Sequence, residues 1–234
     1  MWLRYHLIGQ ELRAVGIDSN CAPTLDVAQA DTHPFLRNRC FGTDPARVAE
    51  LGRAAADGML AAGVLPVVKH MPGHGRAVAD SHHDLPTVTA CQADLADLDF
   101  APFRALADLP MGMTAHIRFT DLDDAPATAS RRMIDLIRGD IGFDGLLMTD
   151  DITMNALSGT QAERALASVA AGCDIVLHCN GTIAQMEPVV QAAGAMGADA
   201  MRRADAALAR RHAPDDADVG ALLAEWRDLT GTPA

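Results

Sequence analysis

The sequence has few aromatic residues, no paired cysteine motif and no long apolar run. Only 4% of its residues are aromatic, with one Tyr and two Trp, which leaves little scope for a long aromatic binding platform. The five cysteines form no CxxC pair and are odd in number, so we expect reduced, structural thiols rather than a disulfide framework. No stretch reaches the ~18 apolar residues of a membrane span.

Positive charge is also scarce. The sequence has 19 Lys and Arg residues and 31 Asp and Glu residues, which gives a net charge of −12. Such a chain repels phosphate backbones and anionic lipid, so we expect neither a nucleic-acid nor a membrane partner. The first residues are interrupted by Arg4, His6, Gln10 and Glu11. They lack the continuous apolar core of a signal peptide, and we therefore expect a cytoplasmic location.

Short apolar runs alternate with helical patterns along the chain, which predicts one α/β domain over residues 1–234. Helices are predicted after the Asp44–Pro45 start, around Met133 to Ile141, and from the capping box TQAE at 160–163 to Gly172. The predicted buried parallel strands are residues 20–27, 63–70, 111–116, 144–150 and 173–179.

Polar residues fall at the carboxyl ends of these predicted strands. Lys69 with His70, His116, Asp150 and His178 all occupy that position. The carboxyl ends carry the functional loops both in a β/α barrel and in a doubly wound sheet. The first strand is not followed by GxGxxG, which argues against a dinucleotide-binding fold.

Residues 69–86, KHMPGHGRAVADSHHDLP, hold four of the nine histidines. A surface loop with incidental histidines is one interpretation. A metal site is another, although no HExxH or strand-end HxH spacing is present. A third is acid/base catalysis, because Asp80 can reach one ring nitrogen of His82 and leave the other to carry protons. Gly73 and Gly75 would then give the loop a mobile backbone.

The same segment resembles the K-H-[FI]-P-G-H-G…D-S-H signature of family 3 glycoside hydrolases, in the β-N-acetylhexosaminidase branch. GFDGLLMTDDITMNAL (142–157) is similar to that family's nucleophile segment, and RNRCFGTDP (37–45) resembles its substrate-arginine loop. The resemblance implies a TIM-type (β/α)8 barrel. It further implies removal of terminal β-linked N-acetylglucosamine (GlcNAc), with retention, from GlcNAc-1,6-anhydro-N-acetylmuramoyl peptides during cytoplasmic peptidoglycan recycling.

Carried over residue by residue, the resemblance assigns Asp150 as the nucleophile, His82 as the acid/base and Asp80 as its partner. Arg39, Lys69 and His70 match sugar-binding positions. The resemblance implies a small carbohydrate substrate, and neither a metal nor another cofactor is expected.

Elementary chemistry agrees with these roles, since a retaining glycosidase needs an anion below the anomeric carbon and a proton donor beside the leaving oxygen. A histidine with a reference pKa of about 6.5 suits the second task. Chemistry alone does not choose between Asp150 and Asp151, and Asp151 is expected to cap the following turn. His116 is expected to be a satisfied structural residue or a substrate contact. His74 and His83 receive no role.

Five predicted strands make up about five of eight βα units, so we expect an N-terminally truncated barrel with unpaired edges at 20–27 and 173–179. The family's D-Q-E-G-G-R-V stretch is absent from the 234 residues. We therefore expect weak or undetectable hydrolysis by residues 1–234 alone. A metal-dependent amidohydrolase-like barrel using His70, His74, His82 and His83, and an inactive homologue, are the alternatives. The oligomeric state is left open.

Overall fold

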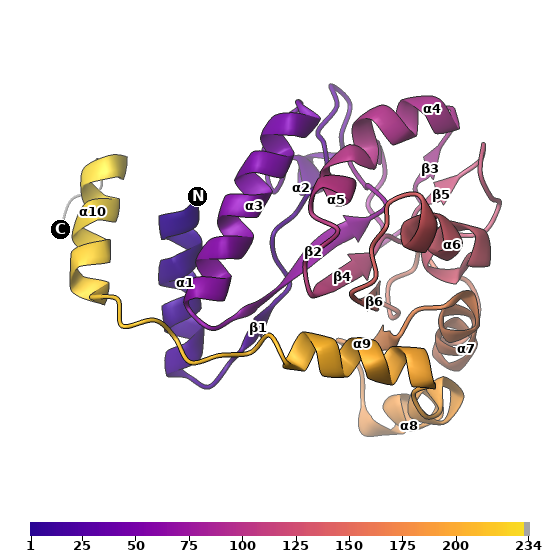
Figure 1. The fold of residues 1–234 in the computed structure, drawn as a ribbon. Coiled ribbons are helices and arrows are strands. Elements are labelled where there is room, and N and C mark those ends of the chain that lie inside the picture. Colours follow the sequence, from indigo (N-terminus) through magenta and orange to yellow (C-terminus); the bar gives the residue numbers. More distant parts are fainter. Residues whose placement is uncertain (232–234) are drawn as a thin grey trace.

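The computed structural model describes residues 1–231, in which helices alternate with short strands (Figure 1). The strands are β1 (Ser19–Asn20), β2 (Leu65–Met71), β3 (Thr87–Val88), β4 (Met111–Thr114), β5 (Arg118–Phe119), β6 (Leu146–Asp151) and β7 (Ile175–Leu177). The helices are α1 (Trp2–Ala14), α2 (Pro34–Arg37), α3 (Pro45–Ala61), α4 (Gln92–Asp94), the π-helix η1 (Leu95–Asp99), α5 (Ala101–Ala105), the 3₁₀ helix η2 (Ala127–Ala129), α6 (Arg131–Gly139), α7 (Gln161–Ala171), α8 (Ile183–Ala193), α9 (Ala198–Leu208) and α10 (Val219–Thr230).

Within the described residues, the main sheet has five parallel strands in the order β1-β2-β4-β6-β7. Each strand of this sheet lies beside the strand of the sheet that precedes it in the chain, and the order never reverses. A doubly wound sheet reverses its strand order at a switch point, whereas a barrel adds strands in one direction. The topology therefore confirms the expected α/β fold, part of a β/α barrel, with β1 and β7 at the open edges.

Four of the five predicted strands are confirmed with shifted bounds, and the first is only partly right. β1 contains just Ser19 and Asn20. Pro23 follows shortly afterwards and has no N–H to donate, so the regular ladder stops. The chain nevertheless stays beside β2, because Leu25 N–H donates to the Lys69 carbonyl at 2.6 Å. Thr24 forms an isolated bridge with Lys69.

The predicted helix signals are confirmed. Asp44 accepts a hydrogen bond from Ala46 N–H at the start of α3. Thr160 and Glu163 form the capping box of α7, and Gly172 ends that helix at φ 115°. Ser130 caps α6 by accepting from Met133 N–H. The short pair β3–β5, the helical segment 92–105 and helices α8 to α10 were not predicted.

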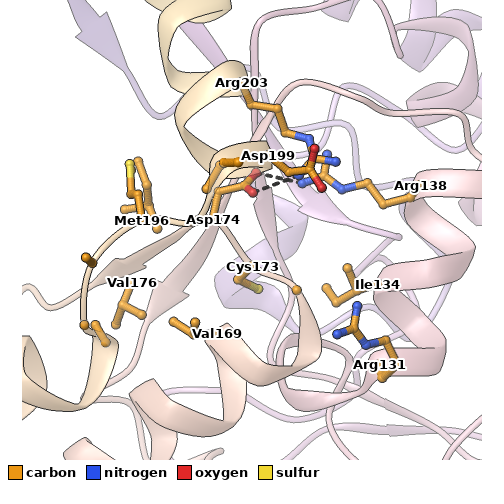
Figure 2. A pocket seen from close by; sticks show the side chains of 18 of the residues that line it. Arg131, Ile134, Arg138, Val169, Cys173, Asp174, Val176, Met196, Asp199 and Arg203 are labelled. Carbon is orange, nitrogen blue, oxygen red and sulfur yellow. Dashed lines mark hydrogen bonds and ion pairs between the residues drawn. The ribbon is translucent and has the colours of Figure 1, made fainter.

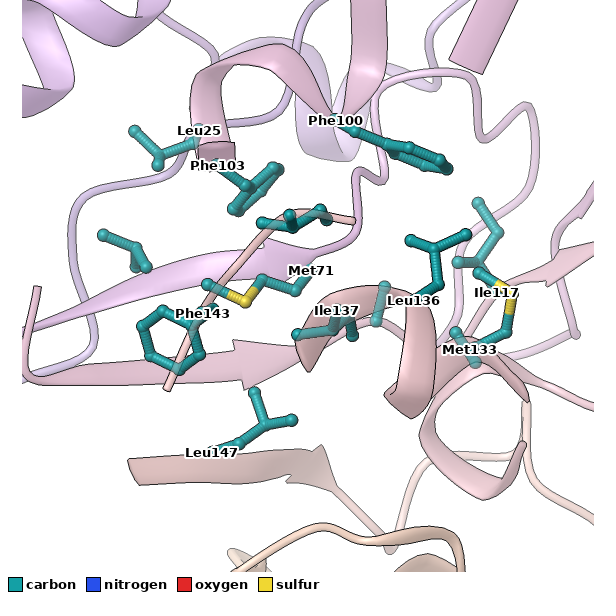
Figure 3. Packing of buried hydrophobic residues seen from close by; sticks show 14 of the residues in the cluster. Leu25, Met71, Phe100, Phe103, Ile117, Met133, Leu136, Ile137, Phe143 and Leu147 are labelled. Carbon is teal, nitrogen blue, oxygen red and sulfur yellow. The ribbon is translucent and has the colours of Figure 1, made fainter. Parts of the chain in front are cut away.

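One face of the sheet packs against α3, α5 and α6 and forms the larger hydrophobic core. Figure 3 shows Phe100 and Phe103 lying over this face, with Met71 and Leu147 contributed by the sheet. The buried rings and branched side chains hold the strands rigidly, and every strand end is therefore placed by close packing.

The other face is lined by alternate residues of the same strands, including Leu65, Val67, Met111 and Met148. Helix α9 lies across this side, where Ala207 completes the cluster (Figure 1). In a closed barrel this would be the interior face. The two clusters show which residues of each strand point to which side, and this alternation decides the direction of the polar residues that end the strands.

Among residues 1–231, no helix is both long and apolar enough to cross a bilayer.

Candidate active site

Asp150 and Asp151 end β6 and point to opposite sides. Asp150 follows Leu146 and Met148 at two-residue steps, so it lies on the inner face of the sheet. There it lines a cavity of ≈ 90 Å³. Asp151 is occupied elsewhere, because its carboxylate accepts hydrogen bonds from Thr153, from Cys179 N–H and from Asn180. The geometry thus assigns Asp151 to capping the turn and leaves Asp150 facing the cavity.

Asp150 is held as a carboxylate. Burial favours its neutral form, but the neighbouring His70 and His116 rings, together with the Asp151 N–H, outweigh burial and keep the pKa of Asp150 below its usual range. The Asp151 N–H donates to Asp150 Oδ1 at 2.8 Å. His70 Nε2 lies 3.8 Å from the other oxygen, Oδ2. A ready anion at a rigid strand end is what a nucleophile requires.

Lys69 and His70 end β2 beside Asp150, and His70 is oriented by Asp26. His70 Nδ1 lies 2.7 Å from Asp26 Oδ2, and the His70 N–H donates to Asp26 Oδ1. A carboxylate only accepts, so the proton is on Nδ1 and Nε2 faces Asp150. Asp26 is fully buried. Burial would raise its pKa, but the neighbouring His70 and His74 hold the pKa of Asp26 below its usual range.

His82 and Asp80 form the expected pair, with His82 Nδ1 2.8 Å from Asp80 Oδ1. The segment is a tight turn, because His83 N–H and Asp84 N–H donate to the Asp80 carbonyl. Slight burial would raise the pKa of Asp80, but the hydrogen bonds from His82 lower it below its usual range. With Nδ1 engaged, Nε2 of His82 is the nitrogen available for proton transfer.

The turn that carries His82 is docked on the segment that follows β6. Asn155 N–H donates to the His82 carbonyl and Ala156 N–H donates to the Ser81 carbonyl. Phe35 packs edge-on against the His82 ring at a centroid distance of 5.0 Å. The Arg39 guanidinium lies 4.5 Å from the centre of the Phe35 ring. One aromatic ring therefore positions both a predicted proton donor and a predicted substrate arginine.

The cavity brings together five of the six predicted site residues, with Asp80 directly behind His82. Its lining consists of Phe35, Arg39, Lys69, His70, His74, Ser81, His82, Asp150 and Met154. A neighbouring cavity of ≈ 440 Å³ shares Arg39 and Lys69 with it. Together the two spaces give the room that a small ligand requires, because ligand sites usually measure about 300–1,000 Å³.

Sequence reasoning missed Asp26 and Phe35. Asp26 lies inside a run predicted as an apolar strand, so a carboxylate in that run was the signal for it. Phe35 carries no distinguishing pattern. The mobility expected of Gly73 and Gly75 stays a prediction. In this structure a Cβ on Gly75 would lie 1.9 Å from the Val27 carbonyl oxygen, and one on Gly73 would lie 2.9 Å from Asp99 Cβ. These glycines permit close backbone packing.

His116 is a satisfied structural histidine. Its Nε2 lies 3.0 Å from the Asp151 carbonyl oxygen and its Nδ1 lies 2.8 Å from Thr128 Oγ1. The carbonyl only accepts, so the proton is on Nε2. Burial lowers the pKa of His116 and favours this neutral form. The residue supports the backbone of β6 directly beneath the reactive end.

The metal alternative is not supported by the placement of its ligands. Within the part of the chain that the structure describes, no three His, Cys, Asp or Glu side chains are arranged to share a metal ion. His70 and His74 are adjacent, with ring centroids 5.6 Å apart, but the cavity lining does not include His83.

A larger cavity of ≈ 660 Å³ lies elsewhere, between α6, α7, β7 and the start of α9 (Figure 2). Its buried charges are already paired. Arg138 and Arg203 both bind Asp174, at 2.7 and 3.0 Å. Size alone would favour this cavity, but it offers no partly buried carboxylate beside a proton donor. The smaller cavity is the better candidate site.

Comparisons with known proteins identify the family of the chain. The sequence profile of the "Glycosyl hydrolase family 3 N terminal domain" matches residues 5–211. A beta-hexosaminidase of Bordetella avium (strain 197N) is 41% identical over 180 residues, which are 75% of this chain and 51% of that protein. One from Tolumonas auensis is 40% identical over 182 residues, 74% of this chain and 53% of that one. The chain spans about half the length of these curated relatives.

Two solved structures share the fold. A glycoside hydrolase family 3 beta-N-acetylglucosaminidase from Paenibacillus sp. str. FPU-7 has 34% identity and a TM-score of 0.80, covering 100% of this chain and 44% of that one. NagZ from Neisseria gonorrhoeae, solved in complex with N-trifluoroacetyl-D-glucosamine, has 31% identity and a TM-score of 0.78. That match covers 97% of this chain and 64% of that one.

Proposed function

The chain belongs to glycoside hydrolase family 3, and from this premise we propose that it carries the catalytic centre of a retaining β-N-acetylhexosaminidase. The observation that carries the proposal is one cavity in which Asp150, the His82–Asp80 pair, Lys69, His70 and Arg39 converge. Relatives named beta-hexosaminidase and a neighbour solved with an N-acylated glucosamine support a terminal N-acetylhexosamine as the sugar.

In the proposed first step, an oxygen of Asp150 attacks the anomeric carbon while the bond from that carbon to the leaving oxygen breaks. The leaving oxygen takes the proton from His82 Nε2, so the alcohol departs uncharged and a glycosyl ester remains on Asp150. The Asp80 carboxylate stabilises the imidazolium before transfer and fixes which nitrogen gives the proton.

In the second step a water molecule replaces the departed alcohol. His82 Nε2 removes one proton from this water as its oxygen attacks the anomeric carbon. The ester bond breaks, the Asp150 carboxylate is regenerated, and the sugar leaves in the β configuration. Lys69, His70 and Arg39 hold the sugar above Asp150 during both steps.

The substrate we propose is a peptidoglycan fragment, GlcNAc linked to 1,6-anhydro-N-acetylmuramoyl peptide, hydrolysed in the cytoplasm. This finer assignment is supported by the likeness of the segments at 37–45, 69–86 and 142–157 to the hexosaminidase branch of the family.

The test is nitrophenol release from p-nitrophenyl β-GlcNAc by purified residues 1–234, with an NMR assignment of the first anomer formed. Turnover by this chain alone is expected to be weak, so the readout is the difference from Asp150→Asn. p-Nitrophenyl β-glucoside is the comparison substrate. The proposal is supported if nitrophenol release is faster from the GlcNAc substrate than from the glucoside, disappears in Asp150→Asn and yields the β anomer first. An α product, or equal release by both proteins, would overturn it.

A further inference from the structure

His74 lines the candidate site but has no part in the chemistry described above. It follows β2 by three residues, and its backbone N–H donates to Asp26 Oδ1 at 2.7 Å. Its ring packs edge-on against His70. The residue is 3% exposed, and it lines the cavity together with Asp150.

Among residues 1–231, neither ring nitrogen of His74 has a hydrogen-bond partner in another residue. Nδ1 is fully buried without a hydrogen bond to another residue. Because His74 lines the cavity, Nε2 is the ring nitrogen through which it can meet a ligand there. A buried N–H without an acceptor is rarer and more costly than a buried lone pair without a donor. The proton therefore belongs on Nε2, where it faces the cavity. An unpaired polar group in a buried place calls for a ligand or an ordered water.

His74 also stays uncharged. Burial and the nearby His70 lower the pKa of His74 to about 4, against the smaller opposing effect of Asp26. At neutral pH it offers a hydrogen-bond donor without a positive charge, unlike Lys69 and Arg39. Such a donor binds a neutral oxygen without competing for the Asp150 carboxylate as a cation would.

The backbone that carries the ring is anchored before any ligand binds. The Asp26 bond holds the His74 backbone on one side, and Ala77 N–H donates to the His74 carbonyl at 3.0 Å on the other. Gly75 is packed against Val27 so closely that no larger residue fits. A donor fixed in this way loses little conformational entropy when it binds.

We propose that His74 is a sugar-recognising residue, whose Nε2–H donates a hydrogen bond to a hydroxyl or acetamido oxygen of the sugar that rests against Asp150. This inference rests on the proposed function, and it adds a specificity contact on the floor of the same cavity.

The first test is independent of turnover. In protein labelled with ¹⁵N-histidine, the two ring nitrogens of His74 are followed by long-range ¹H–¹⁵N correlation from pH 5 to pH 8, with and without GlcNAc. We expect the Nε2–H tautomer throughout this range and a displaced Nε2 resonance at saturating GlcNAc. A His74 ring that titrates within this range, or an Nε2 signal that stays unchanged while other cavity residues respond, would overturn the inference.

The second test compares His74→Phe with wild type, using p-nitrophenyl β-GlcNAc as substrate and GlcNAc as inhibitor. Loss of one neutral hydrogen bond predicts a KM and an inhibition constant raised roughly three- to tenfold. The kcat should change little, because the contact is present in both ground and transition states. His212→Phe, at an exposed histidine remote from the site, is the matched control, and His74→Gln restores a donor if the Phe variant is unstable.

The oxygen is identified with 3-deoxy, 4-deoxy and 6-deoxy GlcNAc and with glucose as inhibitors. The analogue whose affinity is equal in wild type and His74→Phe lacks the partner oxygen. If wild type hydrolyses the GlcNAc substrate and His74→Phe binds every analogue as wild type does, the inference fails and the proposed function stands. If wild type neither binds GlcNAc nor depends on Asp150, both fail.

Discussion

The two ends of the sheet use charged side chains in opposite ways. At the amino-terminal ends of the strands, Asp18, Asp108, Asp144 and Asp174 each precede a strand and each is paired with arginine. At the carboxyl-terminal end, Asp150 faces a cavity, and among the described residues it forms no ion pair with lysine or arginine; His70 Nε2 lies 3.8 Å from it. One end is neutralised by ion pairs and the other is left available.

Several of the arginines at the amino-terminal end come from one segment. Arg202 and Arg203 of α9 bind Asp144, Arg203 also binds Asp174, and Arg211 binds Asp18. This segment lies across the sheet (Figure 1) and connects strands that are separate in the chain. The difference between the ends teaches that paired charges indicate stabilisation, while a buried charge left facing a cavity indicates chemistry.

The largest expected effect is that of Asp150→Asn. Removing the anion that attacks the anomeric carbon should lower kcat by about 10³-fold or more. Asp144→Asn is the matched control, because it removes a carboxylate from the amino-terminal side of β6, the strand that carries Asp150 at its other end. Steady-state turnover of p-nitrophenyl β-GlcNAc measures both. An equal loss of kcat in the two variants would contradict the assignment of chemistry to the carboxyl-terminal end of the sheet and of stabilisation to the amino-terminal end.

His82→Ala should have the next largest effect. It should lower turnover by about 10²–10⁴-fold for substrates with alkyl leaving groups. The loss should be smaller for nitrophenyl substrates, whose leaving oxygen needs little protonation. Asp80→Asn should reduce turnover less than His82→Ala, because the imidazole remains. Activity that is lost on dialysis against a chelator and restored by zinc would favour the metal alternative instead.

Arg138→Ala should change stability rather than chemistry. Arg138 binds Asp174, whose side chain is 4% exposed, and also the carbonyl oxygens of Phe143 and Gly145. Leaving a buried carboxylate with one partner fewer should cost about 3–5 kcal/mol in the free energy of unfolding. Urea denaturation measures this. The kcat per folded molecule should match that of wild type. A loss of kcat without a loss of stability would contradict a purely structural role for Arg138.

Asp144→Asn should have the smallest effect on stability. Hydrogen bonds from Arg202 and the charge of both arginines lower the pKa of Asp144 to about 2 despite slight burial. A lowered folded-state pKa contributes stability above the unfolded value of about 3.9, and this contribution is lost as the pH falls towards 2. The exposed pair is worth up to about 1 kcal/mol. The variant should therefore unfold more easily at pH 7 and equally at pH 2, and high salt should reduce the difference.

The arrangement of the strands and helix caps was predictable because it follows from local chemistry. Asp44, the Thr160–Glu163 capping box and Gly172 act within one helical turn of the sequence, and the structure shows each as expected. The length of β1 was overestimated because the apolar run continues past Pro23. Hydropathy carries no information on the N–H group that proline lacks. The pair β3–β5 has only two residues in each strand, too few for any periodicity to appear.

The candidate site was predictable where one strand end carries its own motif, as in Lys69, His70 and Asp150. Asp26 and Phe35 were not found, because each acts on a residue far away in the sequence: Asp26 on His70, and Phe35 on His82. Contacts over more than forty residues leave no local spacing to detect. The close packing of Gly75 was not found either, because the Val27 backbone, which excludes any side chain there, is also distant in sequence.

Covalent labelling tests the central claim most directly. A slow 5-fluoro β-GlcNAc derivative should glycosylate the enzyme faster than water releases the sugar, so the glycosyl ester accumulates. Digestion and fragmentation mass spectrometry then locate the added mass. We predict an adduct on Asp150, absent from Asp150→Asn. An adduct on Asp151, or no adduct on a protein that turns over p-nitrophenyl β-GlcNAc, would contradict the assignment of the carboxyl-terminal end of the sheet as the catalytic centre.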